Sequence, residues 1–210
     1  MVGHTAVRYY VMGERSVEEL ATDEEIKRMA EIVGESMDGG AVGFSTNRYP
    51  PHVGPDGRSI PGTYAEAKEL LEIAKVVGEK RGLMQNVLDF GGQPEFSVKL
   101  LKDLASTTKD RILFSMGTGP DLESGKRVRG LLKELCSEGG DITAISQPRS
   151  SGFMFGLQSG LPFSGETWDQ LRAMDLKGRL AAIRDTETRN KLIQEASASK
   201  EHLPYNLVFW

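Results

Sequence analysis

Four short apolar segments alternate with four amphipathic segments between residues 22 and 147. The apolar segments predict strands and cover residues 41–46, 83–88, 111–116 and 141–147. Strands that alternate with helices in this way pair in parallel through right-handed crossovers. The chain is therefore expected to be an α/β protein with a parallel sheet built of β/α units. Periodicity alone leaves open whether the sheet is doubly wound or closes into a barrel.

The first helix of this series carries local signals at both ends. Thr22 and Glu25 have the spacing of a capping box, in which the hydroxyl and the carboxylate each bind a free backbone amide. Gly39 and Gly40 end the helix, because glycine adopts the left-handed conformation without a Cβ clash. The apolar positions between them recur at helical spacing and are Ile26, Met29, Ala30, Val33 and Met37.

Similar signals mark the other helices. Thr63 and Glu66 repeat the capping-box spacing before a second helix, which Gly82 is expected to end. A third helix begins near Pro94, a residue favoured in the first helical turn. A further helical pattern over residues 5–12 follows His4 directly, so His4 is expected at a strand-to-helix turn.

The pattern changes beyond residue 148. Residues 150–164 are rich in glycine, serine and phenylalanine and predict a loop long enough to serve a site. Two helical patterns follow, over residues 168–174 and 176–195. At 210 residues the whole chain, 1–210, is expected to form a single domain.

Composition excludes two classes of partner. Hydrophobic residues make up 39 % and charged residues 27 %, as in ordinary globular proteins. The 26 basic and 30 acidic residues are interspersed, and without a basic stripe no nucleic-acid partner is expected. The basic run from Lys126 to Arg129 is interpreted as a solvated helix face. No apolar run reaches the length of a membrane span and no signal peptide is recognisable, so no membrane association is expected.

The single cysteine, Cys136, bears on compartment and core. It permits no intrachain disulfide, which is natural in a reducing compartment, and a cytoplasmic location is expected. Cys136 falls on an apolar stripe at helical spacing and is therefore predicted to be a buried core thiol. The other members of that stripe are Val128, Leu131, Leu132 and Leu135.

Candidate substrate-binding residues follow the strand at 41–46, because ligand sites in α/β proteins lie at the carboxyl ends of strands. Ser45 lies at that end. Arg48, just beyond it, could bind a carboxylate with two parallel hydrogen bonds, or could pair with Asp56 or be solvated. His52 is either a pocket residue or surface. His4, at its turn, is either a site residue or a histidine hydrogen-bonded to the backbone.

Two kinds of catalytic centre are not expected within this chain. The three histidines, His4, His52 and His202, show neither HxH nor HExxH spacing, so no complete metal site is predicted. Ser45 and Ser115 lack the paired glycines of a nucleophile elbow.

Two segments carry a family resemblance. Residues 3–8, with the sequence GHTAVR, and residues 40–46, with the sequence GAVGFST, resemble the central region of N-acyl-D-amino-acid deacylases (D-aminoacylases) in the amidohydrolase superfamily. The loop through His52 and Gly62 and the later segments 152–157 and 180–185 resemble a divergent amidohydrolase-like branch.

The resemblance implies a metal-dependent (β/α)₈ TIM barrel that hydrolyses a small-molecule amide with a metal-bound hydroxide. It implies zinc in full-length relatives, whereas no cofactor is expected to bind this chain alone. The resemblance also places an N-terminal β-domain, an HxH strand and an aspartate ligand outside residues 1–210. The chain is thus expected to be a central fragment with an incomplete catalytic centre.

The sequence departs from that family on two strands. Where the resemblance implies histidine ligands, the chain has Gln85-Asn86 and Ser115-Met116. A neutral amide and a thioether do not replace imidazole for Zn²⁺ at comparable affinity. Two hypotheses follow: a fragment of a hydrolase acting on linear amides, or a catalytically inactive barrel that serves as a binding or structural protein.

Half a barrel would leave sheet edges unpaired. The strands at 41–46 and 141–147 are each expected to lack one partner, and Val42 and Phe44 are expected to face the barrel interior. The resulting apolar patch predicts aggregation, or association of two copies of the chain into a homo-oligomer.

Overall fold

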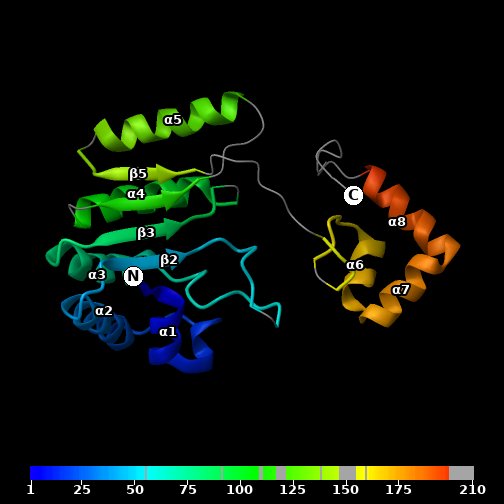
Figure 1. The fold of residues 1–210 in the computed structure, drawn as a ribbon, viewed down its shortest axis with the longest axis horizontal. Coiled ribbons are helices and arrows are strands. Elements are labelled where there is room, and N and C mark those ends of the chain that lie inside the picture. The colour runs from blue at the N-terminus through cyan, green and yellow to red at the C-terminus, as the bar shows by residue number, and fades with distance from the viewer. Residues whose placement is uncertain are drawn as a thin grey trace. The chain divides into compact units, whose positions relative to one another are not determined.

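The computed structural model describes residues 1–54, 56–90, 92–108, 111–116, 122–137, 139–146, 155–158 and 160–198. The chain divides into two compact units, residues 1–148 and 149–210 (Figure 1). Whether they act as the single domain expected from the sequence stays a prediction. His202 and much of the loop predicted at 150–164 lie outside the described residues.

The first unit contains a parallel five-stranded sheet in which strand order follows chain order. Its strands are β1 (Val2–Gly3), β2 (Gly43–Asn47), β3 (Leu83–Val87), β4 (Ile112–Ser115) and β5 (Ile142–Ile145). The predicted α/β class with a parallel sheet is confirmed, and the sheet is not closed within the described residues. Because β1 pairs with β2, the prediction that β2 lacks a partner is wrong. The two residues of β1 are too few to show a periodic signal.

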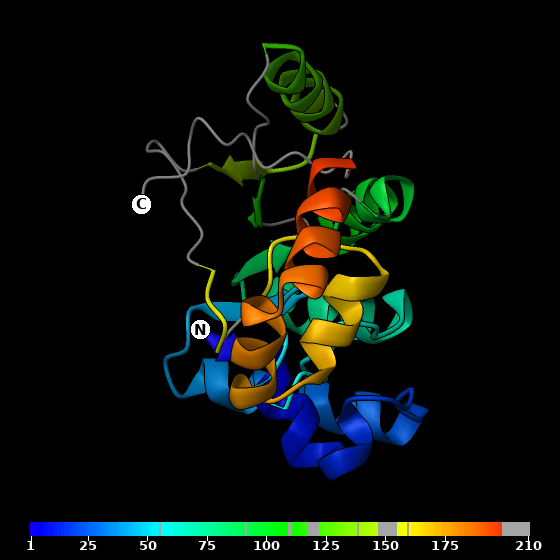
Figure 2. The same ribbon diagram turned by 90° about the vertical axis from the view of Figure 1, so that its right-hand side faces the viewer.

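Helices follow the strands in alternation. They are α1 (His4–Met12), the 3₁₀ turn η1 (Gly13–Ser16), α2 (Asp23–Asp38), α3 (Ala67–Glu79), α4 (Pro94–Thr108) and α5 (Leu122–Ser137). Right-handed crossovers between adjacent parallel strands place successive helices on the same side. Figure 2 shows α2 to α5 along one side of the strands. The sheet therefore has a helix-covered face and an open face.

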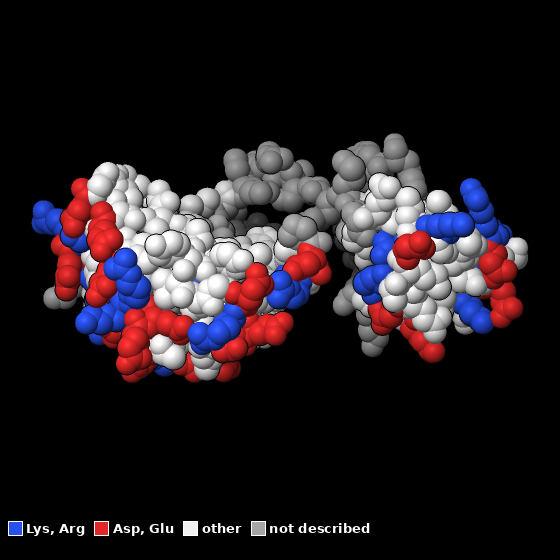
Figure 3. Space-filling view, turned by 90° about the horizontal axis from the view of Figure 1, so that it is seen from below, with Lys and Arg blue, Asp and Glu red and all other residues white. Residues whose placement is uncertain are grey.

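Charges on the exposed surface are mixed in sign. Figure 3 shows Lys and Arg interspersed with Asp and Glu on the face in view. Pairs on single helices include Arg28 with Glu31 at 3.1 Å and Lys75 with Glu72 at 2.6 Å. Exposed pairs of this kind stabilise a fold little.

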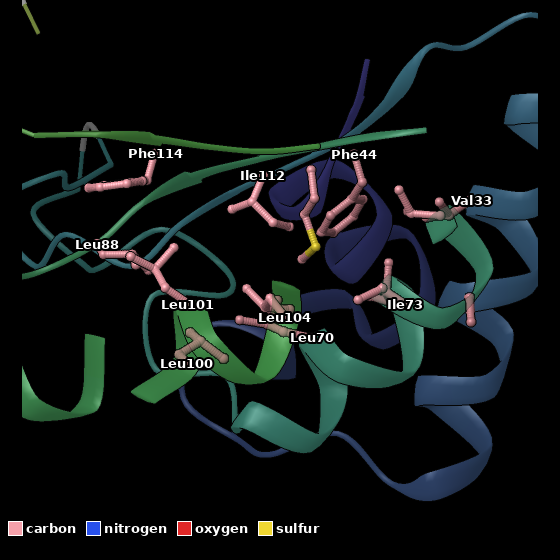
Figure 4. Packing of buried hydrophobic residues seen from close by; sticks show 14 of the residues in the cluster. Val33, Phe44, Leu70, Ile73, Leu88, Leu100, Leu101, Leu104, Ile112 and Phe114 are labelled. Atoms are coloured by element: carbon pink, nitrogen blue, oxygen red, sulfur yellow. The ribbon is translucent and has the colours of Figure 1, made fainter. Parts of the chain in front are cut away.

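The core lies between the helices and the covered face. Phe44, Met84 and Ile112 occupy one row across β2, β3 and β4 and are fully buried. They face a helix layer that includes Ile73 and Leu104 (Figure 4). Two expectations about the barrel interior are therefore wrong. Phe44 points into the helix layer because side chains alternate along a strand, and Val42 precedes β2 and is 64 % exposed.

One predicted capping box is confirmed and the other is wrong. The Thr22 hydroxyl accepts from the Glu25 amide at 3.2 Å, and the Glu25 carboxylate accepts from the Thr22 amide at 2.8 Å. Helix α3 begins only at Ala67, and its N-cap Glu66 makes no side-chain cap. The Thr63 side chain is instead buried, and its hydroxyl donates to the Ile60 carbonyl at 2.9 Å.

Helix ends also differ from the prediction in detail. Gly40, at φ +105°, takes the left-handed conformation after α2, as expected of that glycine pair. After α3 the left-handed residue is Arg81, at φ 55°, rather than Gly82. Gly82 packs closely instead, since a Cβ there would lie 2.3 Å from the Met37 methyl carbon.

Cys136 is exposed, so the prediction of a core thiol is wrong. Its neighbour Leu135 is the buried residue on this part of α5. One residue along a helix rotates the side chain by about 100°, which carries Cys136 to the edge of the stripe. There its thiol lies 3.7 Å from the Ile142 carbonyl oxygen.

The second unit contains three helices: α6 (Glu166–Ala173), α7 (Leu176–Arg184) and α8 (Thr186–Ala198). The helical pattern predicted over 176–195 is interrupted at Asp185, whose carboxylate accepts from the Thr188 amide at 2.8 Å. Helices α6 and α8 are joined by a hydrogen bond from the Trp168 indole to the Leu192 carbonyl at 3.0 Å. Among the described residues of the chain, no helix is long and apolar enough to cross a membrane.

Candidate active site

The carboxyl ends of β2, β3 and β4 form the edge at which the sequence places a substrate site. Side chains on the open face follow the strand register and alternate with the buried ones. They form two rows, Ser45, Gln85, Leu113 and Thr143, and Asn47, Val87, Ser115 and Ile145. None of these eight residues belongs to the buried core. The open face is thus a mixed surface of small polar and aliphatic side chains.

Ser45 and His52 lie near this edge but on different elements. The Ser45 hydroxyl is 3.5 Å from the Val2 carbonyl oxygen. His52 is exposed in the loop after β2, and its Nδ1 lies 2.5 Å from the Asn47 amide nitrogen. The Tyr49 ring packs edge-on against His52 at 5.1 Å. His52 is therefore tied to the end of β2 through Asn47, which has its side chain on the same face as Ser45.

Arg48 follows β2 directly and is half-buried. Its guanidinium donates to the Ala65 carbonyl and lies 4.7 Å above the Phe96 ring. Burial lowers the pKa of Arg48, with the charge of Glu69 opposing this shift and that of Arg8 adding to it. The alternative pairing with Asp56 is wrong, because that carboxylate binds Arg58 at 2.7 Å.

His4 lies on the other side of the sheet. It is at the strand-to-helix turn, as predicted, but only 1 % of it is exposed. Its Nδ1 lies 2.9 Å from the Thr46 hydroxyl and its Nε2 lies 2.6 Å from a Glu69 oxygen. The alternative of a backbone-bonded histidine is wrong, since both partners are side chains. The four predicted residues therefore do not converge on one site. His4 contacts Thr46 of β2 on the helix-covered face of the sheet.

Glu69 and Arg8 were not found by sequence reasoning. Arg8 lies one turn after His4 on α1, and its guanidinium also binds Glu69. Burial alone would raise the pKa of Glu69, but the hydrogen bonds and charges of His4 and Arg8 hold that pKa below its ordinary value. The spacing of His4 and Arg8 on one helix face was the available signal. Nothing local pointed to Glu69.

The residues present do not fit a zinc site. Within the described part of the chain, no three His, Cys, Asp or Glu side chains lie close enough together to hold a metal ion. On β3 and β4 the open face presents Gln85 and Ser115, whose polar atoms are 3.5 Å apart. Asn86 points toward the helices, where its amide donates to the Met84 and Leu113 carbonyls. Neutral amide and hydroxyl groups are weak zinc ligands.

These features define a class of protein. A parallel sheet in chain order with helices on one side is the fold of part of a (β/α)₈ TIM barrel. No family model matches the chain. In sequence it is similar to the D-aminoacylase of Alcaligenes xylosoxydans xylosoxydans, with 32 % identity over 83 residues. That match covers 40 % of this chain and 15 % of the relative.

Solved structures of D-aminoacylase agree with the sequence match. The crystal structure of D-aminoacylase that defines a novel subset of amidohydrolases has a TM-score of 0.59 at 21 % identity. A D-aminoacylase mutant in complex with copper chloride has a TM-score of 0.58 at 20 % identity. Each covers 71 % of this chain, which spans only 30 % of theirs. The resemblance to D-aminoacylase is confirmed, and the chain spans only part of the length of these relatives.

Proposed function

We propose that the chain is part of a hydrolase that acts on linear carbon–nitrogen amide bonds, with N-acyl-D-amino acids as the small-molecule substrates. The observation that carries this proposal is the 32 % identity to a D-aminoacylase, supported by the common fold. The catalytic centre is incomplete in this chain, and the sequence match covers 15 % of the length of that relative.

Within that enzyme, Ser45, Arg48 and His52 are the substrate-binding residues. Arg48 is suited to a carboxylate because its guanidinium is held in place by the Ala65 carbonyl and the Phe96 ring. Ser45 lies on the open face, and His52 is tethered to the same strand end. His4 contributes indirectly, since it contacts Thr46 between Ser45 and Asn47.

The metal of the proposed enzyme is zinc, with ligands supplied by residues outside this chain. A binuclear metal centre is described for D-aminoacylase, whereas the described residues of this chain present no ligand set. When bound, such a metal supplies an activated water for amide hydrolysis. The contribution of this chain is then to bind and orient the substrate.

Location and assembly follow from surface features. The single cysteine supports a reducing compartment, and the cytoplasm is the location we assign to the enzyme. The mixed charges support the absence of a nucleic-acid partner.

Ile145, 46 % exposed on the open face of β5, supports association of two copies of the isolated chain. Light scattering during size-exclusion chromatography tests this, and a monodisperse monomer would contradict it.

A second candidate function is a catalytically inactive barrel that binds a ligand. The observation favouring it is that the two strands on which the family resemblance implies histidine ligands carry Gln85-Asn86 and Ser115-Met116, with Gln85 and Ser115 on the open face. The same substrate-binding residues would serve either function, so the two differ in the metal and in turnover.

The deciding experiment compares this chain with the protein encoded by the reading frame extended on both sides. Both are assayed with N-acetyl-D- and N-acetyl-L-amino acids, with zinc and after chelation. The extended protein is expected to hydrolyse the D-substrates and to lose activity on chelation, whereas the chain alone stays inactive. An extended protein that is folded and hydrolyses none of these amides, with or without zinc, would favour the inactive barrel.

A further inference from the structure

A buried cluster of charged side chains lies behind the candidate site. Helix α1 places His4 and Arg8 one turn apart, and both reach the carboxylate of Glu69 in the first turn of α3. All three residues are at most 2 % exposed. Residues at positions i and i+4 share a helix face, so one carboxylate can bind both.

The remaining donors of the cluster extend it to two further segments. Arg8 donates from Nε to the Ser16 carbonyl at 2.9 Å and from a terminal nitrogen to the Glu19 carbonyl at 2.5 Å. His4 contacts Thr46 at the end of β2. Through His4 and Arg8, Glu69 in α3 is thus linked to α1, to the segment after α1 and to β2.

The same cluster holds the loop of residues 48–66, which connects β2 to α3 and is described apart from residue 55. Gly62 lies against the His4 ring, where a Cβ would be 2.6 Å from Nδ1, and its φ of +96° favours glycine. Thr5, next to His4, donates from its hydroxyl to the Pro61 carbonyl at 3.0 Å. The returning half of the loop therefore rests on the start of α1.

The loop in turn places Arg48. The carbonyl that the Arg48 guanidinium binds belongs to Ala65, three residues after Gly62. A continuous path of contacts runs from Glu69 through His4 and Gly62 to Ala65 and Arg48. Connections longer than about 15 residues without regular structure are uncommon unless they serve a site. The loop of residues 48–66 exceeds that length, and its described residues include an antiparallel bridge between Val53 and Ser59.

Stability alone is a weak reason for such a cluster. Desolvating several charged groups offsets most of their mutual attraction, so apolar residues of similar volume often stabilise a core equally well. The charged groups differ from apolar residues in that their hydrogen bonds are directional, so each bond fixes the orientation of the group that it binds.

We propose that Glu69 is a positioning residue: through His4 and Arg8 it holds the loop 48–66, and with it Arg48, in the geometry that binds substrate. This inference rests on the proposed function only for the nature of the substrate. Its structural part, the order of the loop, is measurable in the chain as it stands.

The test is hydrogen exchange on the Glu69→Gln variant. A glutamine side chain has one acceptor oxygen where the carboxylate has two, and its NH₂ group would face either His4 or Arg8. One charge-assisted hydrogen bond is therefore lost. Exchange of the Thr63 and Ala65 amides, which bond within the loop at 3.1 and 3.2 Å, should accelerate. An increase of about tenfold is expected for the loss of one such bond. Exchange of Leu101 and Leu104 in α4 should stay unchanged.

Glu72→Gln is the matched control. Glu72 lies on the same helix, has a side chain that is 41 % exposed, and binds Lys75 at 2.6 Å, so its variant should leave the loop unchanged. If Glu69→Gln accelerates exchange equally in α4, the residue merely stabilises the unit and the proposal is wrong. Unchanged loop exchange contradicts it equally.

Gly62→Ala keeps the proposal testable if Glu69→Gln does not fold. Its added methyl group displaces the loop from His4 while the ion pairs stay intact. Loop exchange should rise again, and an unaffected loop would show that His4 does not hold it. In the extended enzyme, Glu69→Gln should raise KM for carboxylate substrates more than it lowers kcat. An inactive extended enzyme with the loop result intact would refute the proposed function alone.

Discussion

The two faces of the parallel sheet differ along the same strands. On the covered face, Met84 and Phe114 are fully buried against helices. Their neighbours Gln85 and Ser115 lie on the open face and remain partly exposed, within 3.5 Å of each other. Alternation along a strand therefore gives adjacent residues different surroundings: one face packs in the core, and the other carries partly exposed side chains.

The largest expected effect comes from truncating the covered face. Phe114→Ala should lower the free energy of unfolding by about 3–5 kcal/mol, because it removes buried area and leaves a cavity beside Phe90. Ser115→Ala, one residue along, should change it by no more than about 0.5 kcal/mol. Denaturant unfolding of both variants measures the difference. Equal losses would show that the open face is also packed.

A second pair of substitutions compares the two faces by introducing a negative charge instead of a cavity. Asn86 on the covered face donates to two carbonyls, and its Oδ1 has no partner among the described residues. Asn86→Asp should cost about 3 kcal/mol at neutral pH, since a buried carboxylate would face carbonyl oxygens. The deficit should shrink as pH falls, because protonation restores a donor. Gln85→Glu on the open face should cost less than about 1 kcal/mol. Similar losses at both positions, or a deficit independent of pH, would contradict this assignment.

A third prediction concerns the buried carboxylate behind β2. The pKa of Glu69 is depressed below its ordinary 4.5 by His4 and Arg8, and the charge of Arg48 also acts on it. Its contribution to stability is therefore complete above pH 4.5 and is lost as pH falls through the depressed pKa. Unfolding of the wild type should show this loss, and Glu69→Gln should show a smaller pH dependence in the same range. Parallel curves for the two proteins would contradict the assignment.

Local signals explain most of what the sequence could predict. The capping box at Thr22 was predicted correctly because its partner lies three residues away. The same pattern at Thr63 failed because that hydroxyl is used within a packed loop. Cys136 was predicted wrongly because it lies at the edge of the apolar stripe of its helix. A residue at that edge can be exposed even though the stripe as a whole packs against the core.

The candidate site was predictable only in part. The location of Ser45, Arg48 and His52 at one strand end follows from the chain order of strand and loop. The pairing of His4 with Glu69 joins residues far apart in sequence, and neither residue type indicates the other. Which of Gln85 and Asn86 faces the open side depends on the strand register, which the apolar pattern of so short a strand did not fix.

The smallest expected effect concerns Arg48, which follows β2 directly. Lysine at this position keeps the charge but loses the planar guanidinium that stacks on Phe96 and binds the Ala65 carbonyl. Arg48→Lys should therefore change the stability of the chain by less than about 1 kcal/mol. In the extended enzyme it should raise KM for N-acyl-D-amino acids by about tenfold, as expected for the loss of one charge-assisted bidentate contact. Substrates whose carboxylate is blocked as an amide should show no such increase. Unchanged KM for the free acids would place Arg48 among residues that order the loop without touching substrate, and the carboxylate would then need another partner.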